Sequence, residues 1–132
     1  MYHCHTQFYL VGSGDGIFEI IQGIPPLEHF THAFWRSETP DAALAERADV
    51  ILADLRGRDV PGTLEALRPK EGAERLGLAE KEQIPLLPLA RLHDVWTAPL
   101  SQEELRFRFL RWQEEYKRSK DAWQTSQYLE AA

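Results

Sequence analysis

The stretch ADVILADLRG, residues 48–57, decides the fold. It holds a short, almost continuous apolar run that ends on a carboxylate, Asp54. A run of this kind suits a strand that is buried on both faces at the middle of a parallel sheet. An aspartate at the carboxyl end of such a strand can accept a phosphoryl group, bind a metal ion or turn the chain. Asp54 is therefore the first candidate site residue.

Length and composition limit the class of protein. The chain has 132 residues, 43% of them hydrophobic, which is enough for one well-packed domain and too little for two. A formal net charge of -6 argues against a surface that grips nucleic acid or anionic lipid. The single cysteine, Cys4, cannot form an internal disulfide, and neither a signal peptide nor a membrane-spanning apolar run is present in the sequence. We expect a cytoplasmic domain that binds neither nucleic acid nor membrane.

Strand-like runs alternate with helical patterns along the chain, which is typical of a parallel sheet covered by helices. The expected strands are 7–12, 29–35, 49–54, 73–80 and 93–100. Helical patterns follow them at 14–23, 39–48, 60–69, 81–92 and 101–132. The fourth unit is the weakest, because Gly77 interrupts its strand and Pro85 and Pro88 make its helix irregular.

The last helix carries two apolar stripes. One has the seven-residue rhythm typical of helices that pair, and it consists of Leu105, Phe109, Trp112, Tyr116, Ser119 and Trp123. The other stripe, Phe107 and Leu110, is expected to cover the sheet over the first two turns. The first stripe therefore predicts a homodimer that forms through this helix.

The end of this helix is too long for the sheet that a small domain can supply. Beyond about Tyr116, the side chains of Trp123, Tyr128 and Leu129 would be wet unless another chain or a further domain covers them. We therefore expect a domain at 1–112 and a helical connector at 113–132. A tail that frays or folds back is the alternative.

Several of these features together resemble the receiver domain of two-component signalling. They are the five strand and helix pairs, the Asp closing VILADL (50–55), the Pro in WTAPL (96–100) and the extended last helix. The segment 94–132 more closely resembles the N-terminal region of bacterial diguanylate cyclases, in which a receiver-like domain leads through such a helix into PAS and GGDEF domains. The GGDEF motif itself does not occur in the sequence.

The resemblance implies an α/β, flavodoxin-like (βα)5 fold. This is a three-layer sandwich with a parallel sheet in the order 2-1-3-4-5 and an extended C-terminal helix. It also implies a regulatory fragment, not itself an enzyme, that signals to downstream PAS and GGDEF domains and so to cyclic di-GMP synthesis.

Receivers place defined groups around their acceptor aspartate. Two further acidic residues help it bind Mg²⁺, and a hydroxyl and a lysine contact the phosphoryl oxygens. The resemblance makes Asp54 the acceptor and puts Gly12 and Ser13 at the positions of the acidic pair, with Asp15 a residue or two late. It puts Leu78 or a neighbour at the hydroxyl position and Ala98 at the lysine position. Without the acidic pair and the lysine, a phosphoryl group on Asp54 would have little to offset its charge. The main prediction is a degenerate receiver that uses no metal and no cofactor.

Two alternatives stay open. Asp54 could still be a working phosphoacceptor. The loop GSGDG, from Gly12 to Gly16, could instead bind a small ligand or nucleotide together with Asp54, because glycines allow close backbone approach. The third glycine of a dinucleotide fingerprint would fall at Ile17, however, and no P-loop lysine follows. A glycine-rich turn is the simpler interpretation.

The histidines and the cysteine are weaker candidates. His3, Cys4 and His5 are adjacent and lie near the terminus, where a fixed metal geometry is hard to hold. The remaining histidines are scattered, and each is expected to be a strand residue with a satisfied ring: His29, His32 and His93.

Overall fold

The structure, a computed structural model, describes residues 4–14, 16–87 and 92–131, without the side chains of Cys4 and of residues 121–131. The described strands form one parallel sheet in the order β2-β1-β3-β4-β5. The strands are β1 (Cys4–Val11), β2 (Phe30–Ser37), β3 (Val50–Asp54), β4 (Glu74–Glu80) and β5 (Asp94–Ala98). The helices are α1 (Ile17–Gln22), α2 (Ala42–Arg47), α3 (Val60–Ala66), the 3-10 helix η1 (Lys81–Leu86) and α4 (Gln102–Ala131). The predicted flavodoxin-like strand order is confirmed.

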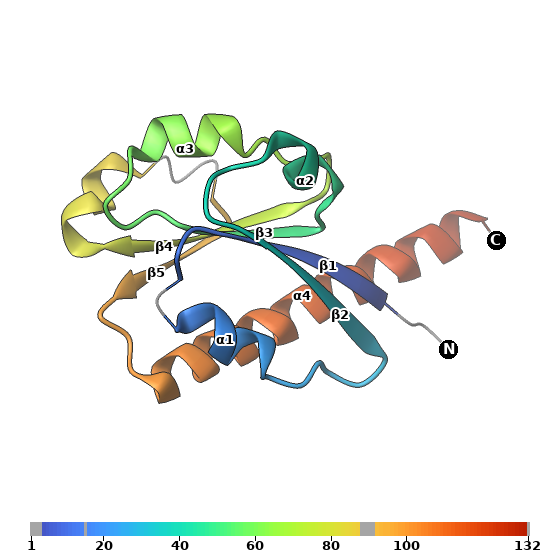
Figure 1. Cartoon of the computed structure of the whole chain (residues 1–132). Coiled ribbons are helices and arrows are strands. Elements are labelled where there is room, and N and C mark those ends of the chain that lie inside the picture. Colours follow the sequence, from blue (N-terminus) through green and yellow to red (C-terminus); the bar gives the residue numbers. More distant parts are fainter. Residues whose placement is uncertain (1–3, 15, 88–91, 132) are drawn as a thin grey trace.

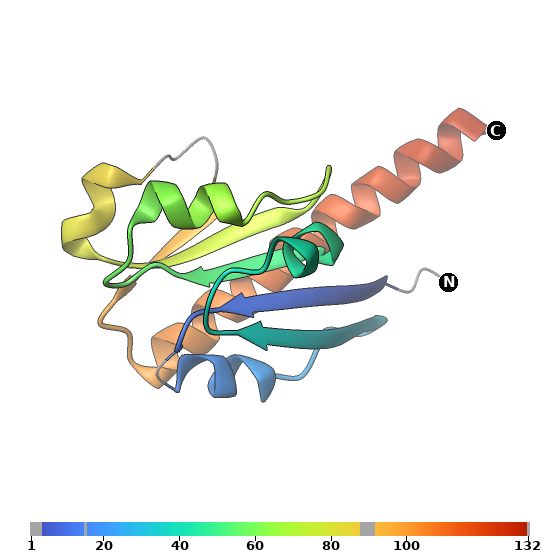
Figure 2. The ribbon, with the colours of Figure 1, turned by 45° about the horizontal axis from the view of Figure 1, so that its top comes forward.

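The sheet is the middle of three layers. Helices α1 and α4 cover one face, and α2 and α3 cover the other (Figures 1 and 2). Alternate residues of a strand face opposite sides of a sheet, so β1 sends Phe8 and Leu10 into one core and Tyr9 and Val11 into the other. All five residues of β3 are buried. This burial explains the near-continuous apolar run that marks β3 in the sequence as the central strand.

The two apolar stripes of α4 have roles opposite to those predicted. Leu105, Phe109, Trp112 and Tyr116 are at most 5% exposed and belong to the core under the sheet. Phe107 and Leu110, which were expected to cover the sheet, are 61% and 43% exposed. The prediction of a dimer seam from Leu105 to Tyr116 is therefore wrong. The physical reason is that the larger stripe, with three aromatic rings, removes more apolar area from water when it is the one that faces the sheet.

The packed part of α4 also extends further than predicted. Gln113 and Tyr116 are 1% and 4% exposed, and the ring centroids of Tyr116 and Phe30 lie 6.3 Å apart. The expected boundary between residues 112 and 113 thus falls inside the part of the helix that is packed on the sheet.

Beyond this point the backbone of α4 continues to Ala131 and projects past the ends of the strands (Figure 2). Ser119 is exposed. The side chains of Trp123, Tyr128 and Leu129 lie outside the described residues. Although α4 has 30 residues, none of the described helices combines the length and the apolar character that a membrane span requires.

Candidate functional site at the carboxyl edge of the sheet

A cavity of about 600 Å³ opens where strands β3, β4 and β5 end. Asp54, Ser13 and Ala98, three of the residues that the sequence assigned to a site, lie in its wall. The remaining wall residues are Arg56, Gly57, Glu80, Lys81, Glu82 and Pro99. The cavity thus has carboxylates and cationic groups side by side.

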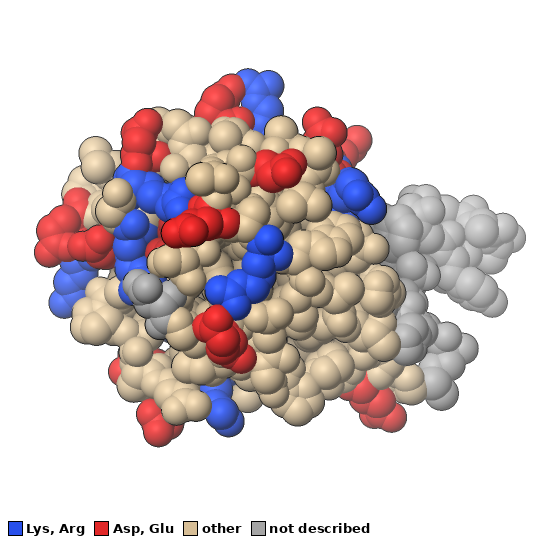
Figure 3. Space-filling view, viewed as in Figure 1, with Lys and Arg blue, Asp and Glu red and all other residues tan. Residues whose placement is uncertain are grey.

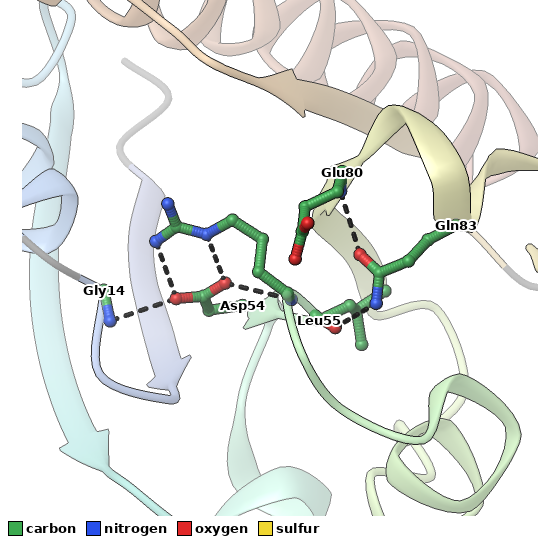
Figure 4. Close-up of polar contacts among 6 residues, drawn as sticks. Gly14, Asp54, Leu55, Glu80 and Gln83 are labelled. Atoms are coloured by element: carbon green, nitrogen blue, oxygen red, sulfur yellow. Dashed lines mark hydrogen bonds and ion pairs between the residues drawn. The ribbon is translucent and has the colours of Figure 1, made fainter.

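The carboxylate of Asp54 is held from several directions. Asp54 is 4% exposed, and the guanidinium of Arg56 donates to both its oxygens, Nε to Oδ1 and Nη2 to Oδ2, each at 2.9 Å. The backbone N–H of Arg56 donates to Oδ1 and that of Gly14 donates to Oδ2, both at 3.2 Å (Figure 4). Such a two-point pair is among the stronger charge-assisted contacts in proteins. The charge of Asp54 is therefore compensated within the chain.

Arg56 is the residue that sequence reasoning missed. Its position two residues after the acceptor-position aspartate, in Asp54-Leu55-Arg56, is the only signal in the sequence. Here the chain leaves β3 and turns at Gly57, whose φ is 68°, and the Arg56 guanidinium pairs with the Asp54 carboxylate.

The glycine loop after β1 closes onto Asp54. Gly12 has φ 112°, a conformation that L side chains rarely adopt, and a Cβ there would lie 2.8 Å from the Asp54 Cβ. Gly14, with φ 72°, directs its N–H at Asp54. The amide that a ligand-binding loop would offer to a phosphate is thus used by the protein's own carboxylate. Among the described loop residues only Ser13 lines the cavity, and Asp15 lies outside the description.

Leu78 does not reach the cavity. It pairs with Asp54 in the sheet register, is 1% exposed and belongs to the core, whereas Glu80 at the end of β4 lines the cavity. An apolar side chain therefore occupies the position where the resemblance expects a hydroxyl, and a carboxylate lines the wall two residues later.

Ala98 lies where the resemblance places a lysine. It ends β5, it is followed by Pro99 across a cis peptide bond, and both residues line the cavity. The lysine that lines the cavity comes from elsewhere: Lys81 is the first residue of η1.

One glutamine joins the two loops that flank the cavity. The Gln83 side chain donates from Nε2 to the carbonyl of Leu55 at 2.5 Å and accepts from the N–H of Glu80 at 2.8 Å (Figure 4). This pair of bonds holds η1 against the segment that carries Asp54 and Arg56. The wall of the cavity is therefore braced, not open on that side.

The described residues contain no group of three or more His, Cys, Asp or Glu side chains that could hold a metal ion. His5 Nδ1 lies 2.6 Å from the Thr31 hydroxyl, and His93 Nδ1 accepts from the N–H of Arg75 at 3.0 Å. His29 lies 3.6 Å from the Glu28 carboxylate, and His3 lies outside the described residues. The expectation of a strand residue with a satisfied ring applies to His29, His32 and His93. His93 has the hydrogen bond, but His29 and His93 both lie just before a strand and not in it.

His32 differs from the other histidines. Its ring packs among Phe8, Phe34 and Phe109 at centroid distances of 4.9, 5.9 and 6.2 Å, and its buried Nδ1 has no hydrogen-bond partner among the described residues. Burial first, and the nearby His5 second, lower the pKa of His32 to about 4 from 6.5. The folded protein therefore prefers the neutral ring.

This pKa predicts how stability depends on pH. Between pH 6.5 and about pH 4 the unfolded chain holds a proton on His32 that the folded chain does not, so the free energy of unfolding should fall as pH falls through this window. We expect a loss of about 1–2 kcal/mol, because partial solvent access reduces the full linkage value. Urea titrations at pH 7 and pH 4.5 measure it, and His32→Leu should remove this share of the pH dependence. If the free energy of unfolding of His32→Leu falls as much between pH 7 and pH 4.5 as that of the wild type, His32 is not the source of this pH dependence.

No family model matches the chain, and no curated protein matches it in sequence. Its fold is similar to that of the REC domain of AraT, a response regulator from Geobacillus stearothermophilus, with a TM-score of 0.58 and 14% identity over 87% of this chain and 98% of that one. For the pilus assembly protein CpaE from Caulobacter crescentus, the TM-score is 0.57 and the identity is 9%, over 79% of this chain and 90% of that one. For the phosphorylated cyanobacterial phytochrome response regulator RcpA, the TM-score is 0.55 and the identity is 15%, over 80% of this chain and 89% of that one. At these identities the likeness shows the fold alone, and the fold is that of a receiver.

Proposed function

We propose that this chain is a non-catalytic, receiver-like signalling module in which Asp54 does not work as a phosphorylation switch. The observation that carries the proposal is the two-point ion pair between Arg56 and Asp54. Both carboxylate oxygens of Asp54 are engaged by donors from the same chain. An oxygen that must attack a phosphoryl group would first have to leave these bonds.

The surroundings of Asp54 give a second line of support. Phosphoryl transfer depends on metal ions and cationic groups that neutralise the developing charge. The resemblance assigns the acidic-pair positions to Gly12 and Ser13 and the lysine position to Ala98, and none of these residues can supply the expected charge. The guanidinium of Arg56 occupies the space beside Asp54 where a cation would be expected, so its positive charge also opposes metal binding.

The proposal gives α4 the role of a connector. The helix is packed on the sheet as far as Tyr116 and then continues beyond it, so a change in the sheet domain could alter its direction (Figure 2). The resemblance of segment 94–132 to diguanylate cyclases supports PAS and GGDEF domains as the downstream partners. Pairing of two such helices remains part of the proposal for residues after Tyr116.

A small phosphodonor tests the proposal directly. The whole chain is incubated with acetyl phosphate and Mg²⁺, and its intact mass is measured beside that of Asp54→Asn. Because the Asp54 carboxylate is engaged by Arg56 and the acidic pair and lysine of receivers are missing, we expect no phosphoryl adduct in the wild type above the level of the variant. A Mg²⁺-dependent adduct that Asp54→Asn abolishes would show a working phosphoacceptor and would overturn the proposal.

A further inference from the structure

The outer edge of β2 is unusual for an exposed strand. β2 pairs with β1 over all eight of its residues, from Phe30 to Ser37, and lies at the end of the sheet. Its sequence, FTHAFWRS, contains no proline, glycine, lysine or acidic residue. Proline and charged side chains, lysine above all, normally protect an edge strand from pairing with another chain.

The hydrogen-bond pattern identifies the backbone groups that face outward. In a strand the N–H and C=O of one residue point to the same side, and successive residues alternate. The Ser37 carbonyl accepts from the N–H of Gly12 on the β1 side, at 2.9 Å. Counting back by twos from Ser37 places Trp35, Ala33 and Thr31 on the β1 side as well. The backbone groups of the residues between them, His32, Phe34 and Arg36, therefore face outward. None of the described residues contributes a backbone hydrogen bond to these outward groups.

The ends of this open stretch are defined. The N–H of Phe30, the next outward residue, is already donated to the Leu27 carbonyl at 2.9 Å. Arg36 carries the one formal charge of the strand, and its side chain is paired with Glu19 on α1 at 2.6 Å. Much of the surface over β2 shows no Lys, Arg, Asp or Glu (Figure 3). The edge of β2 therefore has three residues with unpaired outward backbone groups, and its one charged side chain is already paired.

We propose that a second copy of this chain pairs with β2 along this edge, in the antiparallel direction, with a two-fold axis at Phe34. The three open residues are spaced symmetrically about Phe34. A two-fold axis there places Phe34 opposite Phe34 of the second copy, and His32 opposite Arg36 of the second copy. In that register every outward N–H of each copy meets an outward C=O of the other.

The side chains agree with this register. Phe34 is half-buried and stacks on Phe8 at 5.0 Å between ring centroids, so two such rings would form an aromatic pair across the joint. His32 is neutral at pH 7, because burial lowers its pKa to about 4, so it does not repel Arg36 of the second copy. Any extended strand could satisfy the outward backbone groups, so the side chains decide the partner. A second copy supplies Phe34 opposite Phe34 and His32 opposite Arg36, and this match makes it the partner that we propose.

This inference does not depend on the phosphorylation state of Asp54 or on the connector role of α4. The contact uses the opposite edge of the sheet from β5 and a different surface from the free end of α4. A dimer through α4 and a dimer through β2 can therefore be told apart by which amide groups they protect.

The test compares two substitutions at the centre of the edge. Phe34→Pro removes the outward N–H, which the monomer does not use, and proline is tolerated at such edge positions. Phe34→Ala removes the same ring but keeps the N–H. Sedimentation should show a wild-type dimer, and Phe34→Pro should raise the dimer dissociation constant about tenfold or more above that of Phe34→Ala, because it loses a central bond from each copy. Equal dissociation constants for the two variants would overturn the proposal.

Amide exchange in the wild type gives a test that survives a folding failure of the proline variant. The amides of His32, Phe34 and Arg36 should become protected as the protein concentration rises through the dimer range. Those of Ala33 and Trp35, which face β1, should be protected at every concentration. A chain that stays monomeric, or a dimer in which the three outward amides still exchange fast, would overturn the proposal and leave the proposed signalling role untouched.

Discussion

Replacing Phe109 by alanine is expected to lower the free energy of unfolding by about 3–5 kcal/mol. Phe109 is 1% exposed, and its ring lies 5.7 Å from that of Trp112 and 5.9 Å from that of Phe8. The ring of Trp96 on β5 is 6.5 Å away. Removing Phe109 would leave a cavity where α4 meets the centre of the sheet, and packed aromatic neighbours can collapse into it only in part. This is the largest effect that we expect from a single change in α4.

The same helix provides a matched control. Phe107 lies two residues earlier and is 61% exposed, so Phe107→Ala should change the free energy of unfolding by no more than about 0.5 kcal/mol. Urea denaturation of the two variants, followed by far-UV circular dichroism, measures both. The reverse order of effects would mean that α4 is rotated on the sheet, with Phe107 and Leu110 inward as the sequence had suggested.

The orientation of α4 shows where the sequence stops being sufficient. A spacing of three and four residues marks an apolar stripe equally well in a helix that pairs with a helix and in one that lies on a sheet. The choice between stripes depends on the shape of the sheet face, where Phe8 of β1 and Phe30 of β2 receive Trp112 and Tyr116. Residues so far apart in the chain leave no periodic signal of their contact.

The strand order, by contrast, could be inferred from the sequence and its resemblance. The buried run of β3 identifies the central strand, and the alternation of strands with helices requires parallel crossovers. The strand interrupted by Gly77 also forms, as β4, and a Cβ added at this glycine would lie 3.1 Å from a Leu55 methyl group. The glycine that weakened the prediction thus lies at a tightly packed position of the strand.

The candidate site could be predicted in position but not in chemistry. Asp54 and Ala98 lie in one cavity, as expected from the ends of neighbouring strands. The bond between Arg56 and Asp54 could not be predicted, because it depends on the turn at Gly57 and on the rotamer of a long side chain. Spacing along the chain carries no information about either.

Arg56→Ala is expected to destabilise the protein by about 2–4 kcal/mol near neutral pH. The variant leaves the Asp54 carboxylate, whose side chain is 5% exposed, with two backbone N–H donors and without its ion-pair partner. An uncompensated buried charge costs several kcal/mol, reduced here because the cavity admits water. Arg58→Ala is the control, since that arginine lies two residues later, is half-buried and donates to the Glu38 carbonyl at 2.5 Å. We expect it to cost about 0.5 kcal/mol.

The asymmetry of the pair gives the sharper test. Asp54→Asn leaves Arg56, whose side chain is already 21% exposed and can extend into the cavity, so it should cost less than Arg56→Ala. The double variant Arg56→Ala/Asp54→Asn should recover part of the stability lost in Arg56→Ala, because no buried charge then remains. Urea denaturation of all four proteins measures the coupling. Losses that simply add would mean that the ion pair does not hold Asp54, and a carboxylate free of Arg56 would again be open to a phosphodonor.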